Sequence, residues 1–246
     1  MNYKEIMLNQ LAADFNTTPD ALKAGKNIFT KKAFDSRKRA YENGDAVLQV
    51  LCVNGIAVIN SADDALLECL QKEYAECNAA WFFEIENIRR LDQILKPFGS
   101  NTADMHQYFI PGRNSKKTVN FSETAWYRNG EIEQFRGDNR FNEAFGFNEK
   151  WPDRIGLAAM ENGEILGMAG ASEDSAAAWQ IGLNVSEKSR GKGIGSALLG
   201  TLEQELVQNG LLPFCGTAPS HTVSLRTMSA AGFVPAWSEL YTQKIK

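Results

Sequence analysis

The sequence predicts an α+β protein with a mixed, mostly antiparallel central sheet flanked by helices. Asn-Gly pairs at Asn54–Gly55 and Asn162–Gly163 each separate two runs rich in apolar and β-branched residues. This dipeptide is the strongest short-range signal of a β-hairpin. Other segments repeat apolar residues every three or four positions, which is the period of an amphipathic helix. Hairpin strands are antiparallel, and amphipathic helices need a sheet face to cover, so the two patterns together indicate this class.

Length and charge exclude several classes of function. The chain has 246 residues, 43% of them hydrophobic, which suits one or two globular domains and excludes a wholly disordered protein. A formal net charge of -4 argues against nucleic acid or an anionic membrane as the main partner. There is no apolar run of about 20 residues, and the N-terminus lacks the apolar core of a secretory signal. We therefore expect a cytoplasmic protein, with its oligomeric state (monomer or homodimer) left open.

Candidate metal ligands are few. No CxxC or HxxxH spacing occurs among the cysteines and histidines, so we expect no metal site. Without an export signal, the four cysteines are interpreted as reduced thiols. Cys215 lies in an apolar segment with no adjacent cation to lower its pKa, and we interpret it as a core residue and not as a nucleophile.

Residues 1–104 predict an N-terminal α+β domain. Apolar spacing, caps and turn signals indicate its elements: a helix over 2–15, a short helix after Thr18-Pro19, a hairpin over 47–60, and helices around 66–74 and 85–95. The basic stretch from Lys31 to Arg39 is expected to be a solvated connection. Nothing in this part of the chain has a catalytic pattern.

Residues 105–246 predict a second domain. A strand over 105–110 precedes an aromatic-rich segment, 113–153, which we expect to form short helices whose aromatics fill a core. The remaining elements follow in order: a hairpin over 155–171, a strand over 177–185, a helix from Ile194, a short strand over 214–217, a helix from the cap residue Thr222 to Gly232, and a terminal strand over 240–244.

One loop in this second domain carries a binding signal. Arg190-Gly191-Lys192-Gly193-Ile194-Gly195 lies between a strand and a helix. A helix start presents unpaired N–H groups and the positive end of the helix dipole, and glycines let a phosphate approach the backbone. The Walker pattern fails because Gly193 follows Lys192, and the GxGxxG pattern fails because position 196 is Ser. The loop therefore predicts a pyrophosphate cradle of another kind.

The same six residues match the R/Q-x-x-G-x-G/A motif, and residues 105–246 resemble the GNAT acetyltransferase superfamily. The likeness includes the strand Ile181-Gly182-Leu183-Asn184-Val185 and Ala231-Gly232-Phe233 near the end. It implies a GNAT-like acyl-CoA N-acyltransferase fold and acetyl-CoA as cosubstrate. The cofactor-binding residues that it implies are Leu183, Asn184, Val185, Arg190, Gly191, Lys192, Gly193, Ile194, Gly195 and Ser196.

The resemblance also implies direct attack of an amine on the acetyl thioester, but the proton donor departs from the family pattern. The position that often holds a tyrosine acid carries Met228, and one that often holds asparagine carries His221. His221 is therefore a candidate proton donor or pantetheine contact, with local bonding at a helix start as the alternative. Ser224 and Tyr241 are weaker acid candidates.

Glu173 and Asp174 are candidate bases because they precede the central strand, and their alternative is an exposed turn. The leading hypothesis is an N-acetyltransferase acting on a primary amine of a small molecule or peptide. A non-catalytic acyl-CoA sensor or scaffold, and an acyltransferase for longer acyl groups, remain as alternatives. The N-terminal domain is expected to be an acceptor-side cover or a degenerate relative of the same fold.

Overall fold

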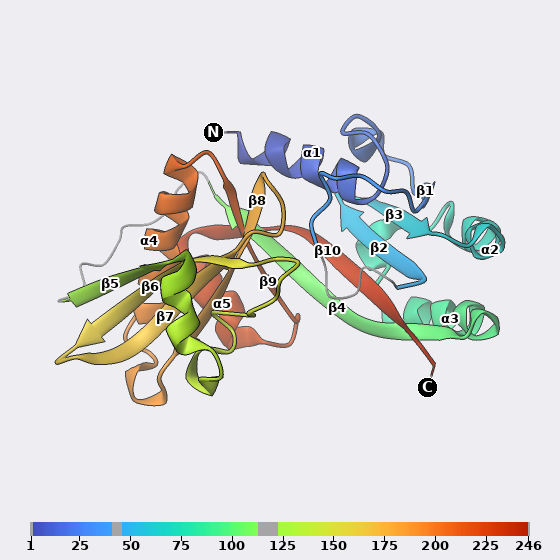
Figure 1. Ribbon diagram of the computed structural model, residues 1–246. Coiled ribbons are helices and arrows are strands. Elements are labelled where there is room, and N and C mark those ends of the chain that lie inside the picture. Colours follow the sequence, from blue (N-terminus) through green and yellow to red (C-terminus); the bar gives the residue numbers. More distant parts are fainter. Residues whose placement is uncertain (1, 41–45, 113–122, 246) are drawn as a thin grey trace. The chain divides into compact units, whose positions relative to one another are not determined.

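The computed structural model describes residues 2–40, 46–112 and 123–245, and the chain folds as two compact units (Figure 1). The N-terminal unit comprises residues 4–108 and 236–246, and the C-terminal unit comprises residues 1–3 and 109–235. Along the chain, the change from the N-terminal to the C-terminal unit comes after Tyr108. From Ala236 onward the chain belongs to the N-terminal unit again, and the predicted division into residues 1–104 and 105–246 stays a prediction.

The described part of the N-terminal unit contains both helices and strands. The helices are α1 (Tyr3–Asp14), α2 (Asp64–Tyr74) and α3 (Ile85–Leu95), with short 3-10 turns η1 (Ala21–Lys23), η2 (Ala79–Trp81) and η3 (Lys96–Phe98). The strands are β1 (Ile28–Lys31), β2 (Leu48–Val53), β3 (Ile56–Ser61), β4 (Ser100–Pro111) and β10 (Phe233–Lys244), in the spatial order β1-β3-β2-β10-β4. Apolar residues of α2 and α3 pack on β2, β3 and β10 to form the core of this unit.

The local signals of the N-terminal unit are confirmed. Asn54 and Gly55 both take positive φ, at 51° and 79°, which is the conformation of a two-residue hairpin turn. Asp63 caps α2 by accepting a hydrogen bond from the Leu66 backbone N–H at 2.9 Å. Gly99, in the left-handed region, ends the turn that follows α3.

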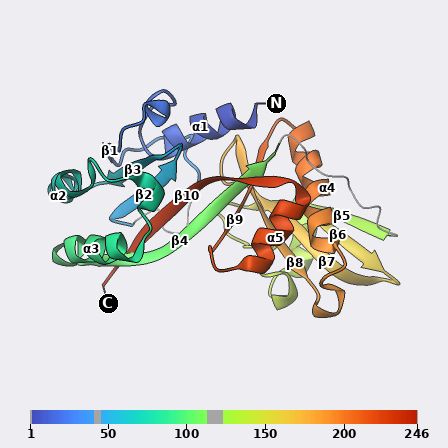
Figure 2. The same ribbon diagram turned by 180° about the vertical axis from the view of Figure 1, so that it is seen from behind.

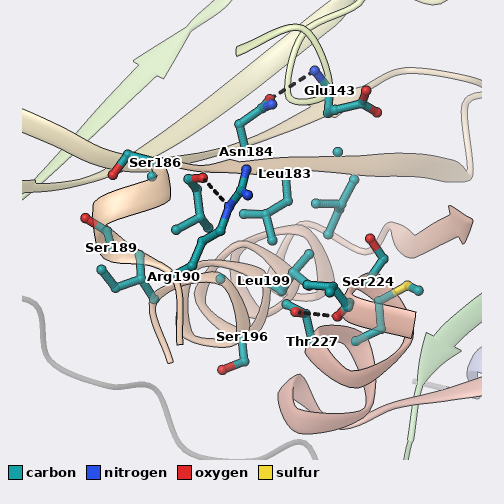
Figure 3. A pocket seen from close by; sticks show the side chains of 18 of the residues that line it. Glu143, Leu183, Asn184, Ser186, Ser189, Arg190, Ser196, Leu199, Ser224 and Thr227 are labelled. Carbon is teal, nitrogen blue, oxygen red and sulfur yellow. Dashed lines mark hydrogen bonds between the residues drawn. The ribbon is translucent and has the colours of Figure 1, made fainter. Parts of the chain in front are cut away.

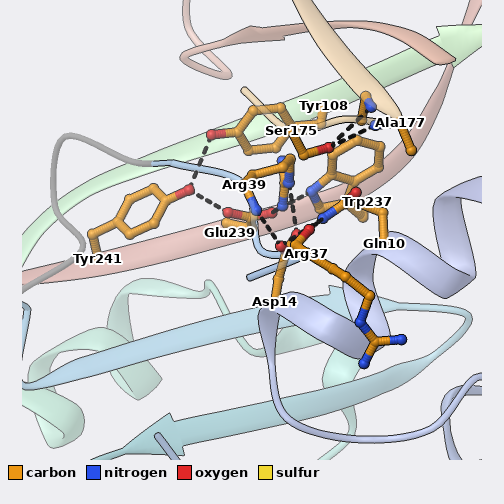
Figure 4. A network of polar contacts seen from close by, with 11 residues as sticks. Gln10, Asp14, Arg37, Arg39, Tyr108, Ser175, Ala177, Trp237, Glu239 and Tyr241 are labelled. Carbon is orange, nitrogen blue, oxygen red and sulfur yellow. Dashed lines mark hydrogen bonds and ion pairs between the residues drawn. The ribbon is translucent and has the colours of Figure 1, made fainter. Parts of the chain in front are cut away.

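The prediction that the basic stretch is solvated is wrong at Arg39. Its guanidinium is buried and lies between two buried carboxylates, with Nε donating to Asp14 at 2.6 Å and Nη2 to Glu239 at 2.6 Å (Figure 4). Trp237 and Tyr241 also donate to Glu239. Arg39 therefore connects α1 to β10 inside the N-terminal unit, which a count of charges along the chain does not reveal.

The C-terminal unit is built on an antiparallel sheet with helices packed against it. Its described strands are β5 (Glu123–Arg128), β6 (Asp153–Glu161), β7 (Glu164–Ser172), β8 (Ala178–Val185) and β9 (Leu212–Thr217), in the spatial order β9-β8-β7-β6-β5. These neighbours pair antiparallel except β8 and β9, which are parallel. The helices are α4 (Ile194–Gln208) and α5 (Thr222–Ala231), and the 3-10 turns are η4 (Asn129–Phe135), η5 (Asn139–Phe141) and η6 (Glu187–Ser189).

β5 is a strand where short helices were predicted. Residues 113–122 of that segment lie outside the described residues, but Glu123–Arg128 pairs along its whole length with β6, from Glu123↔Met160 to Arg128↔Ile155. The six residues have no turn signal of their own, so the pairing with β6 decides their conformation. The predicted short helices do follow, as η4 and η5.

Different elements cover the two faces of this sheet. α4 and α5 pack on the face that carries Leu157, Ala169 and Ile181 (Figure 2). The opposite face carries Ala158 and Met168 and is covered by the η4–η5 segment. The aromatics of that segment fill a core, as predicted: Phe135, Phe141 and Phe145 are all buried.

Among the described residues, no helix is both long and apolar enough to cross a bilayer. The same part of the chain holds no group of three or more His, Cys, Asp or Glu side chains placed to hold a metal ion.

α4 carries a buried carboxylate that should make stability depend on pH. Glu203 is 2% exposed, its Oε2 has no hydrogen-bond partner in the described residues, and burial raises its pKa to about 7. The unfolded chain releases this proton near pH 4.5, while the folded chain keeps it until about pH 7. The stability contributed by the neutral carboxyl is therefore lost as pH rises from about 5 to above 7.

A Glu203→Gln variant is expected to remove this pH dependence and to be more stable than the wild type above pH 7, by on the order of 1–3 kcal/mol. Urea unfolding of both proteins between about pH 5 and pH 8.5 measures the difference. The exposed Glu161 provides the control, because Glu161→Gln should track the wild type at every pH. A difference between Glu203→Gln and wild type that does not change with pH would contradict the assignment.

Candidate functional site

The site begins where two parallel strands separate. β8 and β9 pair at Ala178↔Leu212, Trp179↔Pro213 and Gln180↔Phe214. β8 continues to Val185 and stays paired with β7 on its other side. Within the described residues, the edge of β8 from Ile181 to Val185 therefore has no ladder partner on the β9 side. The main-chain groups that point to that side, rather than to β7, could pair with a ligand, and among them the Val185 carbonyl already accepts a hydrogen bond from Arg190 Nε.

The predicted anion loop lies directly beyond this free edge. Gly191 and Gly193 have φ of 77° and 80°, a region that favours glycine. A Cβ added to either residue would have no neighbouring atom within 4 Å, so the loop is open on that side. Gly193 is the N-cap of α4, a helix of 15 residues, and it has no side chain that could cap the helix. The first N–H groups of α4 therefore make no hydrogen bond to an N-cap side chain. The loop is an open cradle at the positive end of a helix dipole.

Two polar contacts hold the loop in place. Arg190 Nε donates to the carbonyl oxygen of Val185 at 3.4 Å, which connects the loop to the end of β8 (Figure 3). Ser196 Oγ donates to the carbonyl oxygen of Gly193 at 2.9 Å, within the first turn of α4. The cradle is therefore held by contacts within the protein itself.

A cavity of about 1130 Å³ joins the free edge, the cradle and the start of α5. Nine of the ten predicted cofactor-binding residues line it, namely Leu183, Asn184, Val185, Arg190, Gly191, Gly193, Ile194, Gly195 and Ser196. Lys192 is not among the lining residues and its side chain is exposed. An extended ligand with a pyrophosphate at one end and a hydrogen-bonding chain at the other fits this arrangement.

His221 lines the cavity together with two hydroxyl groups. Its Nδ1 is 3.1 Å from Ser224 Oγ and 3.4 Å from Thr217 Oγ1. His221 occupies the N-cap position of α5 without a side-chain cap bond, and the predicted cap, Thr222, is the first helical residue. Met228 also lines the cavity and is buried, so the place expected for a tyrosine acid offers no proton.

Of the remaining candidates, Ser224 lines the cavity, whereas Tyr241, Glu173 and Asp174 lie outside its lining. Tyr241 is in the N-terminal unit and donates its hydroxyl to Glu239. Glu173 accepts a hydrogen bond from Arg154 Nε at 2.6 Å, and Asp174 is buried and accepts from Ser172 Oγ at 2.7 Å. A base role for Glu173 or Asp174 remains a prediction that requires a path through water.

Cys215 lines the cavity but is poorly suited to attack. It is 3% exposed, and burial, followed by the nearby Glu203 carboxylate, raises the pKa of its thiol. A thiolate is the nucleophilic form of cysteine, so the raised pKa keeps this group inert at neutral pH. The interpretation of Cys215 as a core residue is confirmed.

The sequence interpretation missed the loop that covers the other face of β8. The backbone N–H groups of Glu143 and Ala144 both donate to Asn184 Oδ1, at 2.9 and 2.8 Å. A Cβ on Gly182 would lie 1.7 Å from the Glu143 carbonyl oxygen, and one on Gly170 would lie 2.1 Å from that of Ala144. Two glycines inside predicted strands signal such a close backbone approach, but they do not identify the segment that makes it.

Comparisons with known proteins place this unit in a family. Residues 122–233 match the acetyltransferase (GNAT) family. A search of curated protein sequences gave no match.

Solved structures of acetyltransferases show a limited likeness to this chain. A GCN5-related N-acetyltransferase-like protein from Streptococcus suis is 13% identical, with a TM-score of 0.46, and the match covers 98% of this chain and 100% of that one. A GCN5-related N-acetyltransferase from Kribbella flavida is 13% identical, with a TM-score of 0.48, over 63% of this chain and 64% of that one, less than two thirds of its length. A Salmonella typhimurium protein solved with its cofactor acetyl-CoA is 16% identical, with a TM-score of 0.36, over 50% of this chain and 94% of that one.

The family match spans the separated strands, the glycine cradle and both helices that border the cavity. Acetyl-CoA-dependent acyl transfer is the general activity of that family. Residues 122–233 of this chain form an acetyltransferase domain of the GNAT family.

Proposed function

We propose that the protein transfers the acetyl group of acetyl-CoA to a primary amine of a small molecule or peptide, by direct attack of the amine on the thioester. The observation that supports this most strongly is the continuity of the cavity, which connects the anion cradle to the free edge of β8. A pyrophosphate-binding loop alone suits many nucleotides, whereas a free strand edge next to it suits the amide-rich pantetheine arm.

The residues that would hold acetyl-CoA are the cofactor residues named above. The N–H groups from Gly191 to Ser196 would receive the pyrophosphate, and the free edge from Leu183 to Val185 would pair with the amides of the arm. Arg190 adds a positive charge beside the glycines of the loop. When bound, acetyl-CoA supplies a thioester carbonyl that an amine can attack.

The chain's own groups would manage charge and protons around that carbonyl. A main-chain N–H on the free edge near Leu183 is suited to stabilise a developing oxyanion. An alkyl amine has a pKa near ~10.4, so it must lose a proton before attack, directly to a base or through water. His221, which has the Ser224 and Thr217 hydroxyls beside it, would protonate the departing thiolate or contact the pantetheine arm.

Thiol release from acetyl-CoA across a panel of alkyl amines, amino sugars and peptides tests the proposal, with calorimetric titration of acetyl-CoA beside it. Turnover of at least one amine, with acetylation of its nitrogen shown by mass spectrometry, would support the proposal. A protein that neither binds acetyl-CoA nor releases thiol with any amine would contradict it.

His221→Ala tests the proton role. If the imidazole protonates the thiolate, kcat should fall by about 100-fold or more while the Kd for acetyl-CoA stays unchanged. If it is a contact, the Kd should rise instead. His221→Asn is the matched control, since it keeps a polar group but cannot titrate: recovery of activity in that variant would contradict proton transfer.

A second candidate function rests on Met228. Because a buried thioether lies where a proton donor is expected, a domain that binds acyl-CoA without turnover is the alternative. Tight binding of acetyl-CoA with no thiol release in the amine panel would favour this sensor role. Replacing acetyl-CoA by succinyl-CoA and longer acyl-CoA thioesters in the same assay tests the third possibility, an acyltransferase for larger groups.

A further inference from the structure

Glu143 lies in the segment that covers the outer face of β8. It lines the cavity together with its neighbour Asn142, and its side chain is exposed. Within the described residues, no salt bridge involves Glu143. Other acidic groups of the same unit are engaged, as Asp138 is by Arg140 at 2.7 Å and Glu173 is by Arg154 at 2.6 Å.

Contacts with β8 hold the backbone of Glu143 in place. Asn184 Oδ1 accepts from the N–H groups of Glu143 and Ala144, and Asn184 Nδ2 donates to Asn142 Oδ1 at 3.2 Å. The Glu143 carbonyl occupies the space that a Cβ of Gly182 would fill. Glu143 is therefore anchored over Gly182, two residues past the last β8–β9 pair at Gln180↔Phe214.

This anchoring puts Glu143 on the face of β8 that points away from the cradle. Successive side chains of a strand alternate between faces. Leu183 points toward α4, where it lies near Gly195, whereas Asn184 points to Glu143 on the other side (Figure 3). Since residues from both faces line one cavity, the cavity passes through the opening between β8 and β9, with the cradle on one face and Glu143 on the other.

A carboxylate in this position favours a particular kind of acceptor. The nitrogen that attacks must be neutral, so it cannot be the lasting partner of a carboxylate. A second cationic group on the acceptor keeps its charge throughout the reaction, so it can stay paired with the Glu143 carboxylate. When the acceptor covers Glu143 it excludes water, and the lower dielectric constant strengthens this ion pair.

We propose that Glu143 is the specificity-determining residue for the acceptor, and that it binds a second positive charge on a diamine or another multiply charged amine. This inference rests on the proposed function, because it names the acceptor class of the same site. It also assigns a role to Asn184 as a positioning residue, whose side chain holds the backbone of Glu143 over the opening.

Glu143→Gln, which removes the charge and keeps the size, tests the inference. The kcat/KM for a linear diamine should fall by about 5- to 50-fold, mainly through KM, while an alkyl monoamine of the same length changes less than about twofold. The Kd for acetyl-CoA should be unchanged. Glu149→Gln is the matched control, since Glu149 is exposed on the same segment and does not line the cavity. Equal losses for diamine and monoamine, no loss for either, or the same loss in Glu149→Gln would overturn the inference.

A binding measurement separates this inference from the proposed function. The diamine is titrated calorimetrically into the full chain saturated with CoA, for the wild type and for Glu143→Gln. Binding that weakens in the variant and with added salt supports the inference even if no amine is acetylated, in which case the proposed function alone fails. Diamine affinity that is equal in the two proteins, or absent from the wild type, overturns the inference whatever the turnover.

Discussion

Gly193→Asp should abolish acetyl-CoA binding, with a Kd raised by at least about 100-fold. The substitution places a carboxylate at the N-cap of α4, in the open space where the cradle would receive the pyrophosphate. Two effects act in the same direction. Like charges repel at short range, and the side chain competes for the N–H groups that would donate to a phosphate oxygen. The φ of 80° at this position adds backbone strain for any residue other than glycine.

Calorimetric titration with acetyl-CoA measures the effect, and a matched variant isolates the cause. Gly163 has a φ of 77° in the turn between β6 and β7, and a Cβ there would meet nothing within 4 Å. Gly163→Asp therefore brings similar strain and equal charge at a distance from the cradle, and we expect that variant to bind acetyl-CoA like the wild type. An unchanged Kd in Gly193→Asp, with the protein folded by circular dichroism, would discredit the assigned loop.

Arg39→Met is expected to destabilise the N-terminal unit by about 3–5 kcal/mol. The Arg39 guanidinium forms ion pairs with both Asp14 and Glu239, whose side chains are 0% exposed. Removing it leaves two buried carboxylates without their cation, which is the costly way to break a buried ion pair. It also removes a cation that lies 5.2 Å from the centre of the Trp237 ring.

Urea unfolding followed by tryptophan fluorescence and by circular dichroism measures this loss. Arg37→Met is the control, because Arg37 pairs with Asp35 on the surface and its side chain is 78% exposed, so its removal should cost less than about 1 kcal/mol. Adding Glu239→Gln to Arg39→Met should recover part of the loss, since one unpaired charge then disappears. Equal stability of the two single variants would show that the buried network contributes nothing.

Features set by neighbouring residues were predictable from the sequence. The hairpin turns need residues that accept positive φ, so Asn54–Gly55 and Asn162–Gly163 identify them without any knowledge of the fold. The cradle was predictable for the same reason, because glycines, a helix start and basic side chains lie within one hexapeptide. Most of the cofactor residues inferred from that motif line the cavity, and Lys192 is the exception.

Features that depend on distant partners were not predictable. The strand character of β5 comes from pairing with β6, and Arg39 is buried only because Asp14 and Glu239 converge on it from far along the chain. Glu143 shows the same limit: its own sequence context is an aromatic-rich segment, and only contact with Asn184 brings it over the opening of the cavity.

By itself, the sequence determined that this chain has an α+β fold with an open glycine loop at the start of one helix, because turn chemistry, helix caps and unpaired N–H groups are properties of adjacent residues. The tertiary structure alone decided where β8 and β9 part, which carboxylate lines the cavity opposite the cradle, and which charges are buried. Those outcomes depend on contacts between segments far apart in the sequence, whose free energies come from packing and desolvation and leave no periodic trace along the chain.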